Sequence, residues 1–169
     1  HIKFVTNGLL MTDQAIESLV DLGINRVMVS IDGATAATYE TIRVEGKFDR
    51  LVERLITLKR IKATHGSKTP ALKFSWVLMR SNLHEVLDLV ELANRVGAEE
   101  IYFRHLVPFA ELDVSRELLF DTPHLVNEAL DHSKLEAGGA ELHLTEFDAG
   151  RLAREAAETA WPLVRKGHN

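Results

Sequence analysis

The chain alternates between short apolar runs and longer segments in which apolar residues recur every three or four positions. Short runs rich in Val, Ile, Leu and Phe that end in polar residues or glycine are typical of buried strands. The strands predicted in this way cover residues 2–6, 26–31, 72–79 and 101–103. Helical spacing predicts helices between them, within residues 12–23, 38–43, 48–58 and 82–97.

Capping residues support the ends of two of these helices. Thr12 suits the amino-terminal cap of the first helix, and Gly23 and Gly97 suit carboxyl-terminal ends. Asn82, followed three residues later by Glu85, resembles a capping box with asparagine as the cap. We therefore expect the helix that ends at Gly97 to begin at this pair.

Beyond residue 108 the pattern is weaker. It predicts an extended loop over residues 109–120, a helix over 123–135, a short strand over 142–144 and a helix over 151–158. Strands and helices alternate at least four times along the chain, which favours right-handed β-α units and a parallel sheet. The expected fold class is therefore α/β, and a barrel fits best. A closed eight-fold barrel needs about 250 residues, so 169 residues can form only part of one.

Composition narrows the class of protein. Hydrophobic residues make up 46% of the chain, enough for the core of one domain. The formal net charge of −5 offers no concentrated basic surface, so we expect no nucleic-acid partner. No apolar run is long enough to span a membrane, and the start of the sequence lacks a signal-peptide pattern. We expect a cytoplasmic protein with no membrane partner.

The sequence contains no cysteine. This absence excludes disulfides, thiolate catalysis and cysteine-ligated iron–sulfur clusters within these residues. The chain begins with His1 rather than methionine, and a strand is predicted immediately after it. We expect it to be a piece of a longer protein.

Polar residues gather where the predicted strands end. Because parallel strands bring their carboxyl ends to one edge, these residues predict a site there: Thr6–Asn7, Ser30–Asp32, Arg80–Asn82 and Arg104–His105. The alternative is that the asparagine and aspartate residues only form turns and caps.

The remaining polar residues point to no second site. His105 alone is more often a hydrogen-bonded structural histidine than a ligand. His124, His132 and His143 lack the spacing of a metal site, so we expect none. Glu99 and Glu100 read as a solvent-exposed pair.

Several of these segments together resemble a known enzyme family. They are F-V-T-N-G at residues 4–8, V-S-I-D-G at 29–33, T-Y-E-T-I-R at 38–43 and V-L-M-R-S-N at 77–82. In this order and spacing they closely resemble the middle of radical S-adenosylmethionine (SAM) enzymes, in the variety that carries a SPASM domain for auxiliary clusters. The resemblance covers roughly residues 2–108, and residues 109–169 carry little of it.

The resemblance implies a fragment of a partial (β/α)6 TIM-like barrel, with its third to sixth strands in residues 1–108. Residues 109–169 would be a carboxyl-terminal extension. In this family SAM lies across the carboxyl ends of the strands and ligates a 4Fe-4S cluster. Such an enzyme is an oxidoreductase that cleaves SAM reductively to a 5'-deoxyadenosyl radical, which abstracts hydrogen from a peptide or small-molecule substrate.

The resemblance also implies roles for individual residues. Arg43 matches the position that pairs with the SAM carboxylate, and a guanidinium suits that task because it forms two charge-assisted hydrogen bonds. The other implied cofactor contacts are Thr6 and Ser30 to SAM, Asn82 to its ribose, and Leu106 or Val107 to its adenine. Asp32, Arg104 and His105 are expected on the substrate side. No catalytic residue is predicted.

Two departures from the family matter. The Cys-x-x-x-Cys-x-x-Cys loop that follows the family's first strand and the Gly-Gly-Glu segment that follows its second are both missing from these residues. We therefore expect the parent protein to carry the cluster and this fragment to be inactive and without one. Cutting at this point would also leave the strand over residues 2–6 with an unpaired edge, through which the fragment could self-associate.

Two other functions stay open at this stage. One is a different barrel enzyme, such as a metal-free lyase or aldolase, which needs a Schiff-base lysine or an acid–base pair at the strand ends. Lys3 and Lys73 lie early in their strands and give this alternative little support. The other is a non-catalytic binding module on a degenerate barrel. Three cysteines in the family spacing upstream of His1 would favour the radical SAM interpretation.

Overall fold

The structure is a computed structural model that describes residues 1–107, 114–119, 122–136 and 141–144. Its strands are β1 (Lys3–Thr6), β2 (Arg26–Ser30), β3 (Ala71–Leu78), β4 (Glu100–His105) and β5 (Glu141–Leu144). Its α-helices are α1 (Asp13–Asp21), α2 (Ala36–Ile42), α3 (Phe48–Thr64), α4 (Val86–Val96) and α5 (Pro123–Glu136). Two short 3-10 helices are η1 (Leu83–Glu85) and η2 (Ser115–Glu117).

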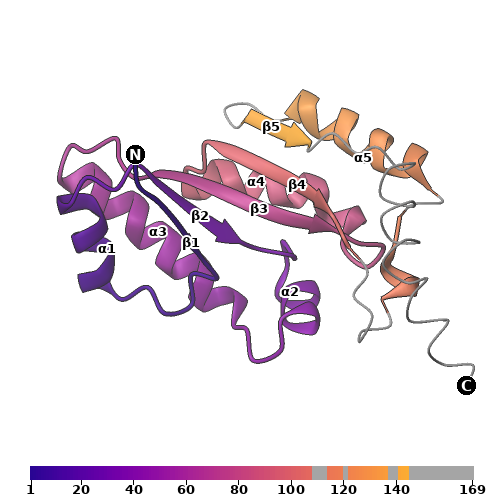
Figure 1. The fold of residues 1–169 in the computed structure, drawn as a ribbon, viewed down its shortest axis with the longest axis horizontal. Coiled ribbons are helices and arrows are strands. Elements are labelled where there is room, and N and C mark those ends of the chain that lie inside the picture. Colours follow the sequence, from indigo (N-terminus) through magenta and orange to yellow (C-terminus); the bar gives the residue numbers. More distant parts are fainter. Residues whose placement is uncertain (108–113, 120–121, 137–140, 145–169) are drawn as a thin grey trace, which may run out of the picture.

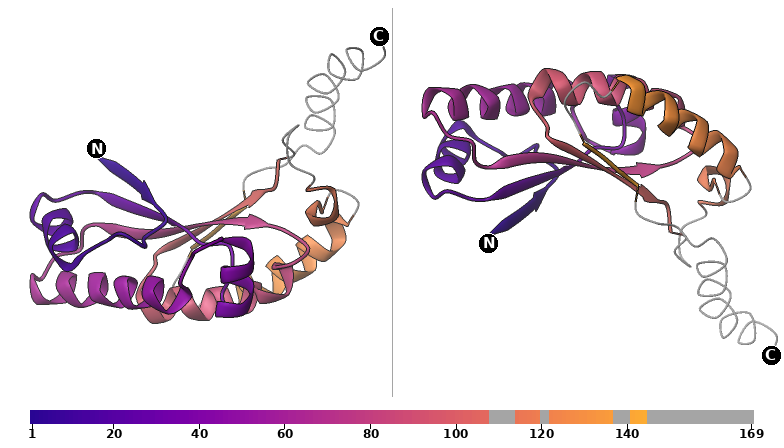
Figure 2. Two further views of the ribbon diagram at one scale, coloured as in Figure 1. Left: turned by 90° about the horizontal axis from the view of Figure 1, so that it is seen from below. Right: turned by 90° about the horizontal axis from the view of Figure 1, so that it is seen from above.

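The five strands form one sheet in the order β1-β2-β3-β4-β5, and each neighbouring pair is parallel. Each strand therefore lies beside the strand that precedes it in the sequence, as in a barrel rather than in a doubly wound sheet. The helices lie on one side of the sheet (Figures 1 and 2). The predicted α/β fold class with a parallel sheet of β-α units is confirmed.

The core lies between the sheet and its helices. It is built from alternate strand residues, which are buried on the helix side, and from the inner faces of α1, α3 and α4. Its largest fully buried side chains include Tyr39, Leu55, Phe74, Trp76 and Phe103. The opposite face of the sheet is not covered by any helix of the described residues (Figure 2). None of the described helices is long and apolar enough to cross a membrane.

Most predicted elements are confirmed, including the helix over residues 123–135 and the short strand over 142–144. The predicted capping box is wrong. Asn82 precedes η1 without a side-chain cap bond, and Glu85 bonds to α2 instead of to its own helix. Within the loop expected over residues 109–120, the described part contains η2. The helix predicted over residues 151–158 lies outside the described residues.

Candidate functional site

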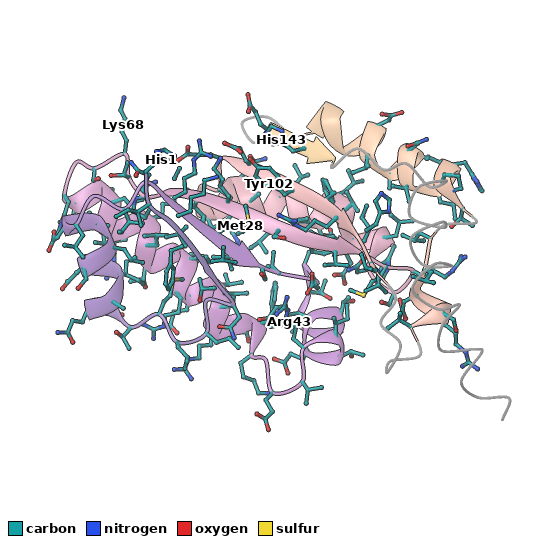
Figure 3. All side chains as sticks on the ribbon, in the orientation of Figure 1. His1, Met28, Arg43, Lys68, Tyr102 and His143 are labelled. Atoms are coloured by element: carbon teal, nitrogen blue, oxygen red, sulfur yellow. The ribbon has the colours of Figure 1, made fainter. Side chains whose placement is uncertain are left out.

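An ion pair joins the loop after β2 to the end of α2. Asp32 lies just beyond β2 and is 6% exposed, and Arg43 follows the last residue of α2 (Figure 3). Arg43 donates to Oδ2 of Asp32 from Nε at 3.0 Å and from Nη2 at 2.5 Å. The other oxygen of Asp32 accepts the backbone N–H of Val77 at 3.0 Å. The aspartate therefore ties Arg43 to the carboxyl end of β3.

Asn82 is fully buried beside this pair, and both polar atoms of its side-chain amide bond to backbone groups. Nδ2 donates to the carbonyl oxygens of Asp32 at 3.0 Å and Val77 at 2.8 Å, while Oδ1 accepts from the N–H of Met79 at 2.9 Å. These bonds hold the loops after β2 and β3 against each other. The expected ribose contact of Asn82 stays a prediction, because every polar atom of its side chain has a protein partner in this structure.

Glu85, which the sequence suggested only as half of a capping box, is the most heavily bonded carboxylate of this region. It is 3% exposed. Its oxygens accept from the N–H groups of Ala34 at 2.7 Å and Thr35 at 3.3 Å, and from the hydroxyls of Thr35 and Thr38, both at 2.6 Å. Burial acts to raise the pKa of Glu85, but these hydrogen bonds outweigh it and hold the pKa below its ordinary value. Glu85 is therefore ionised at neutral pH and caps α2 from 50 residues away.

Strand alternation places Ser30 and Thr6 on opposite faces of the sheet. Thr6 pairs in register with the fully buried Val29, so its side chain lies on the helix side, where it lines a hollow of about 260 Å³ beside α1. Its hydroxyl accepts the N–H of Gly8 at 3.0 Å. Ser30 pairs with Ser75 and lies on the uncovered face. The sheet brings the two strand ends together but not the two hydroxyls.

The same alternation separates Arg104 from His105. Arg104 is exposed on the uncovered face, and its Nε donates to the hydroxyl of Ser75 at 3.1 Å. His105 pairs in register with the buried Leu78 on the helix side. Of the two residues expected to contact adenine, Leu106 is half-buried and Val107 is exposed. The uncovered face thus holds Ser30 and Arg104, while Thr6 and His105 belong to the packing of the helices.

The position of His105 predicts how stability depends on pH. Burial lowers the pKa of His105. A base with a lower pKa in the folded protein binds fewer protons there than in the unfolded chain, so its contribution is complete above about pH 6.5 and is lost as the pH falls below that value. We expect the free energy of unfolding to fall more steeply below about pH 6.5 in the wild type than in His105→Asn. Urea denaturation at several pH values measures both slopes, and equal slopes would contradict the prediction.

A second polar cluster lies on the uncovered face, nearer the amino ends of the strands. Lys73 of β3 is almost fully buried and donates a short hydrogen bond to Oε1 of Glu100, while the hydroxyl of Tyr102 donates one to Oε2. The ring of His143 stacks on that of Tyr102 at 4.9 Å between centroids (Figure 3). The expectation that Glu100 is solvent-exposed is therefore wrong, because its side chain is only 20% exposed and lies between Lys73 and Tyr102.

Glu100, Glu141 and His143 together offer three possible metal ligands within 4.8 Å of one another. They come from two neighbouring strands, so sequence spacing could not have shown them. Lys73 and Tyr102 already bond to the two oxygens of Glu100, and Glu141 is 79% exposed. The arrangement is that of a hydrogen-bonded ion-pair network.

Comparison with known proteins agrees with the resemblance in sequence. No family model matches the chain. The chain is 33% identical over 119 residues to the AdoMet-dependent heme synthase of Methanosarcina barkeri, a match that covers 70% of the chain and 32% of that enzyme. It is 31% identical over 124 residues to a probable GTP 3',8-cyclase of Saccharolobus islandicus, covering 69% of the chain and 38% of the relative. The chain spans about one third of the length of these curated relatives.

Solved structures show the same fold at low sequence identity. Streptococcus suis SuiB bound to S-adenosylmethionine has a TM-score of 0.66 and 11% identity, covering 87% of this chain and 33% of SuiB. SuiB bound to its precursor peptide SuiA gives a TM-score of 0.64, also at 11% identity, over 91% of this chain and 34% of SuiB. The fold is therefore that of part of a TIM-like barrel, and the chain's homologues are members of the radical SAM family.

Arg43 could bind a further carboxylate, such as that of SAM, whereas the chain has no cysteine for an iron–sulfur cluster. Asp32 engages Nε and Nη2 of Arg43 and, among the described residues, no hydrogen bond joins Nη1. The Arg43 side chain is 28% exposed, so the guanidinium can bind a second carboxylate. The 169 residues contain no cysteine and offer no thiolate to a cluster.

Proposed function

We propose that this chain is the central barrel segment of a radical SAM oxidoreductase. One observation carries the proposal: a preorganised guanidinium, Arg43, stands at the carboxyl edge of a parallel sheet whose sequence relatives include an AdoMet-dependent enzyme. SAM, cleaved with an electron from a cluster bound outside these residues, would supply a 5'-deoxyadenosyl radical that takes hydrogen from a peptide or small-molecule substrate. In this proposal, the chain itself binds and orients SAM.

Each part of the edge has a task in this proposal. Arg43 binds the carboxylate of SAM, and Asp32 holds Arg43 in place while sharing its charge. Ser30 lies on the uncovered face of the sheet, at the end of β2, where its hydroxyl can bond to the same ligand. Asp32 and Arg104 are assigned to the substrate side, and Arg104 is exposed on the uncovered face, where it bonds to Ser75.

The proposal also includes SPASM-type auxiliary clusters, a cytoplasmic location, a 4Fe-4S cluster held by the parent protein, and a division of the chain into residues 1–108 and 109–169. It further includes self-association of the chain through β1. Self-association is supported because β1 pairs only with β2 among the described strands, and Ile2, Phe4 and Val5 are 59%, 45% and 66% exposed.

The proposal is tested on the full-length protein that contains this chain. After anaerobic reconstitution with iron and sulfide, the protein is mixed with SAM and dithionite, and 5'-deoxyadenosine is measured by chromatography. Formation of 5'-deoxyadenosine that requires the protein is expected. SAM binding without its cleavage would favour a non-catalytic binding module, and the absence of both would overturn the proposal.

Arg43→Ala should weaken SAM binding by about 1.5 to 3 kcal/mol, the range for a hydrogen bond to a charged group, whereas Ser30→Ala should cost nearer 1 kcal/mol. Equilibrium dialysis on the reconstituted protein measures both effects. Arg60→Ala is the control, because Arg60 is 64% exposed on α3 and its change should leave binding unaltered. If Arg43→Ala binds SAM like the wild type, the carboxylate contact is assigned to the wrong residue.

A further inference from the structure

The helix that carries Arg43 is short and is held at both ends. α2 contains seven residues, too few to be stable by itself. At its amino end Thr35 accepts the N–H of Thr38 at 3.3 Å, and Glu85 binds Ala34, Thr35 and Thr38. At its other end the side chain of Arg43 donates to Asp32 at 3.0 Å and 2.5 Å. Contacts outside the helix therefore fix its position.

Glu85 is the longest-range of these contacts and the most buried. It accepts four hydrogen bonds, two of them from backbone N–H groups at the start of α2. The two N–H groups bond to Oε2 and the two hydroxyls to Oε1, so a carboxylate accepts all four bonds. A primary amide can accept only the two N–H bonds and would force both hydroxyls to act as acceptors. The negative charge also lies at the positive end of the helix dipole. The site is thus built for a carboxylate.

Other contacts of α2 link the position of its amino end to the position of Arg43. Tyr39, in the middle of the helix, is fully buried and packs on Phe48 at 5.6 Å between ring centroids, so α2 cannot roll freely on the core. The Arg43 side chain then reaches back to Asp32 with two hydrogen bonds. A shift at the start of α2 therefore moves the guanidinium.

We propose that Glu85 is a positioning residue that caps α2 and thereby sets where Arg43 meets the carboxylate of SAM. This inference rests on the proposed function for its ligand, and on the described hydrogen bonds for the link between Glu85 and Arg43. The proposed SAM site then depends on two elements: the end of α2, which carries Arg43, and the end of η1 after β3, which carries Glu85. A purely structural Glu85 would affect stability but not the contribution of Arg43 to binding.

The test is a double-mutant cycle on SAM affinity in the full-length reconstituted protein, with thermal unfolding measured in parallel. Glu85→Gln should weaken SAM binding by about fivefold or more in the wild-type background and by less than about twofold in the Arg43→Ala background. Thr38→Val, which removes one donor and no charge, should have a smaller effect of the same kind. Glu117→Gln is the matched control, since Glu117 also accepts a backbone N–H, that of Ser81, but does not bond to α2.

Equal effects of Glu85→Gln in both backgrounds would overturn the inference. If Glu85→Gln does not fold, Thr38→Val replaces it in the double-mutant cycle and the same comparison decides the inference. If the wild type does not bind SAM, the proposed function fails, and the exchange rate of the Arg43 Nε–H, measured by ¹⁵N NMR, decides the inference alone. That proton bonds to Asp32, so Glu85→Gln should accelerate its exchange relative to Glu117→Gln. An unchanged rate would refute the link between Glu85 and Arg43.

Discussion

Replacing Lys73 by methionine is expected to lower the free energy of unfolding by about 3 kcal/mol, the low end of the range for breaking a buried ion pair. The Lys73 side chain is 3% exposed, and methionine keeps most of its length while removing the charge. Glu100 would then retain the hydroxyl of Tyr102 but lose its cationic partner. Although burial raises the pKa of Glu100, the hydrogen bonds from Lys73 and Tyr102 outweigh it and lower the pKa, which shows how strongly they favour the ionised form.

Urea denaturation followed by circular dichroism measures this loss. Lys47→Met is the control, because Lys47 binds Glu40 at 2.9 Å while 69% exposed, and such a surface pair contributes less than about 1 kcal/mol. Adding Glu100→Gln to Lys73→Met should recover part of the loss, since it removes the uncompensated charge. The prediction fails if Lys73→Met costs no more than Lys47→Met.

The alternation of strands and helices could be predicted from the sequence because it depends on local pattern. Apolar runs that end in glycine or polar residues mark β2 and β3, and helical spacing marks α3 and α4. Even the short strand β5 was found, with Leu142 and Leu144 as its signal. Parallel pairing of consecutive strands then follows from the connection rules.

The faces of the strand ends could have been predicted but were not. In β4, Ile101 and Phe103 are buried on the helix side, and His105 continues the same alternation. In β2, Val27 and Val29 are buried, so Ser30 falls on the other face. Because side chains alternate between the two faces of a strand, the sequence already places His105 and Ser30 on opposite faces of the sheet. The site predicted at the carboxyl ends of the strands depends not only on where each strand ends but also on the face on which its last side chain lies.

The partners of Glu85 and Lys73 could not be predicted, because they depend on register and on loops that meet in space. Glu85 lies 47 to 51 residues from its partners at the amino end of α2, and the local capping box was the simpler interpretation of Asn82 and Glu85. Lys73 meets Glu100 only because β3 and β4 pair in one particular register. A single sequence carries no signal for either contact.

The two polar networks lie at opposite ends of the strands. Lys73 and Glu100 are paired near the amino ends of the strands, where polar groups in barrels stabilise the fold. Asp32 and Arg43 lie at the carboxyl ends, where barrels bind ligands. Substitutions in the first network should therefore change stability, and those in the second should change binding. The exception is a substitution that displaces α2 as a whole.

Gly33→Ala is that substitution, and it is expected to cost about 3 kcal/mol of stability or more, at or beyond the upper end of the usual range for overpacking. A Cβ at Gly33 would lie 2.3 Å from the backbone nitrogen of Tyr39 and 2.6 Å from its Cα. These are backbone atoms of α2, and no rotamer change can move them away. Relief requires α2 to shift, against its bonds to Glu85 at one end and to Asp32 at the other.

Thermal and urea unfolding measure the cost, with Gly23→Ala as the control. An added Cβ at Gly23 meets no atom within 4 Å, but Gly23 has a φ of +61°, so alanine there should cost only about 1 to 2 kcal/mol of backbone strain. Because Arg43 ends α2, Gly33→Ala should also weaken SAM binding in whatever protein remains folded, and Gly23→Ala should not. If the Gly33→Ala protein is as stable as the Gly23→Ala protein, α2 can shift at little cost in free energy. The contacts of Glu85 and Asp32 would then not hold the helix as described.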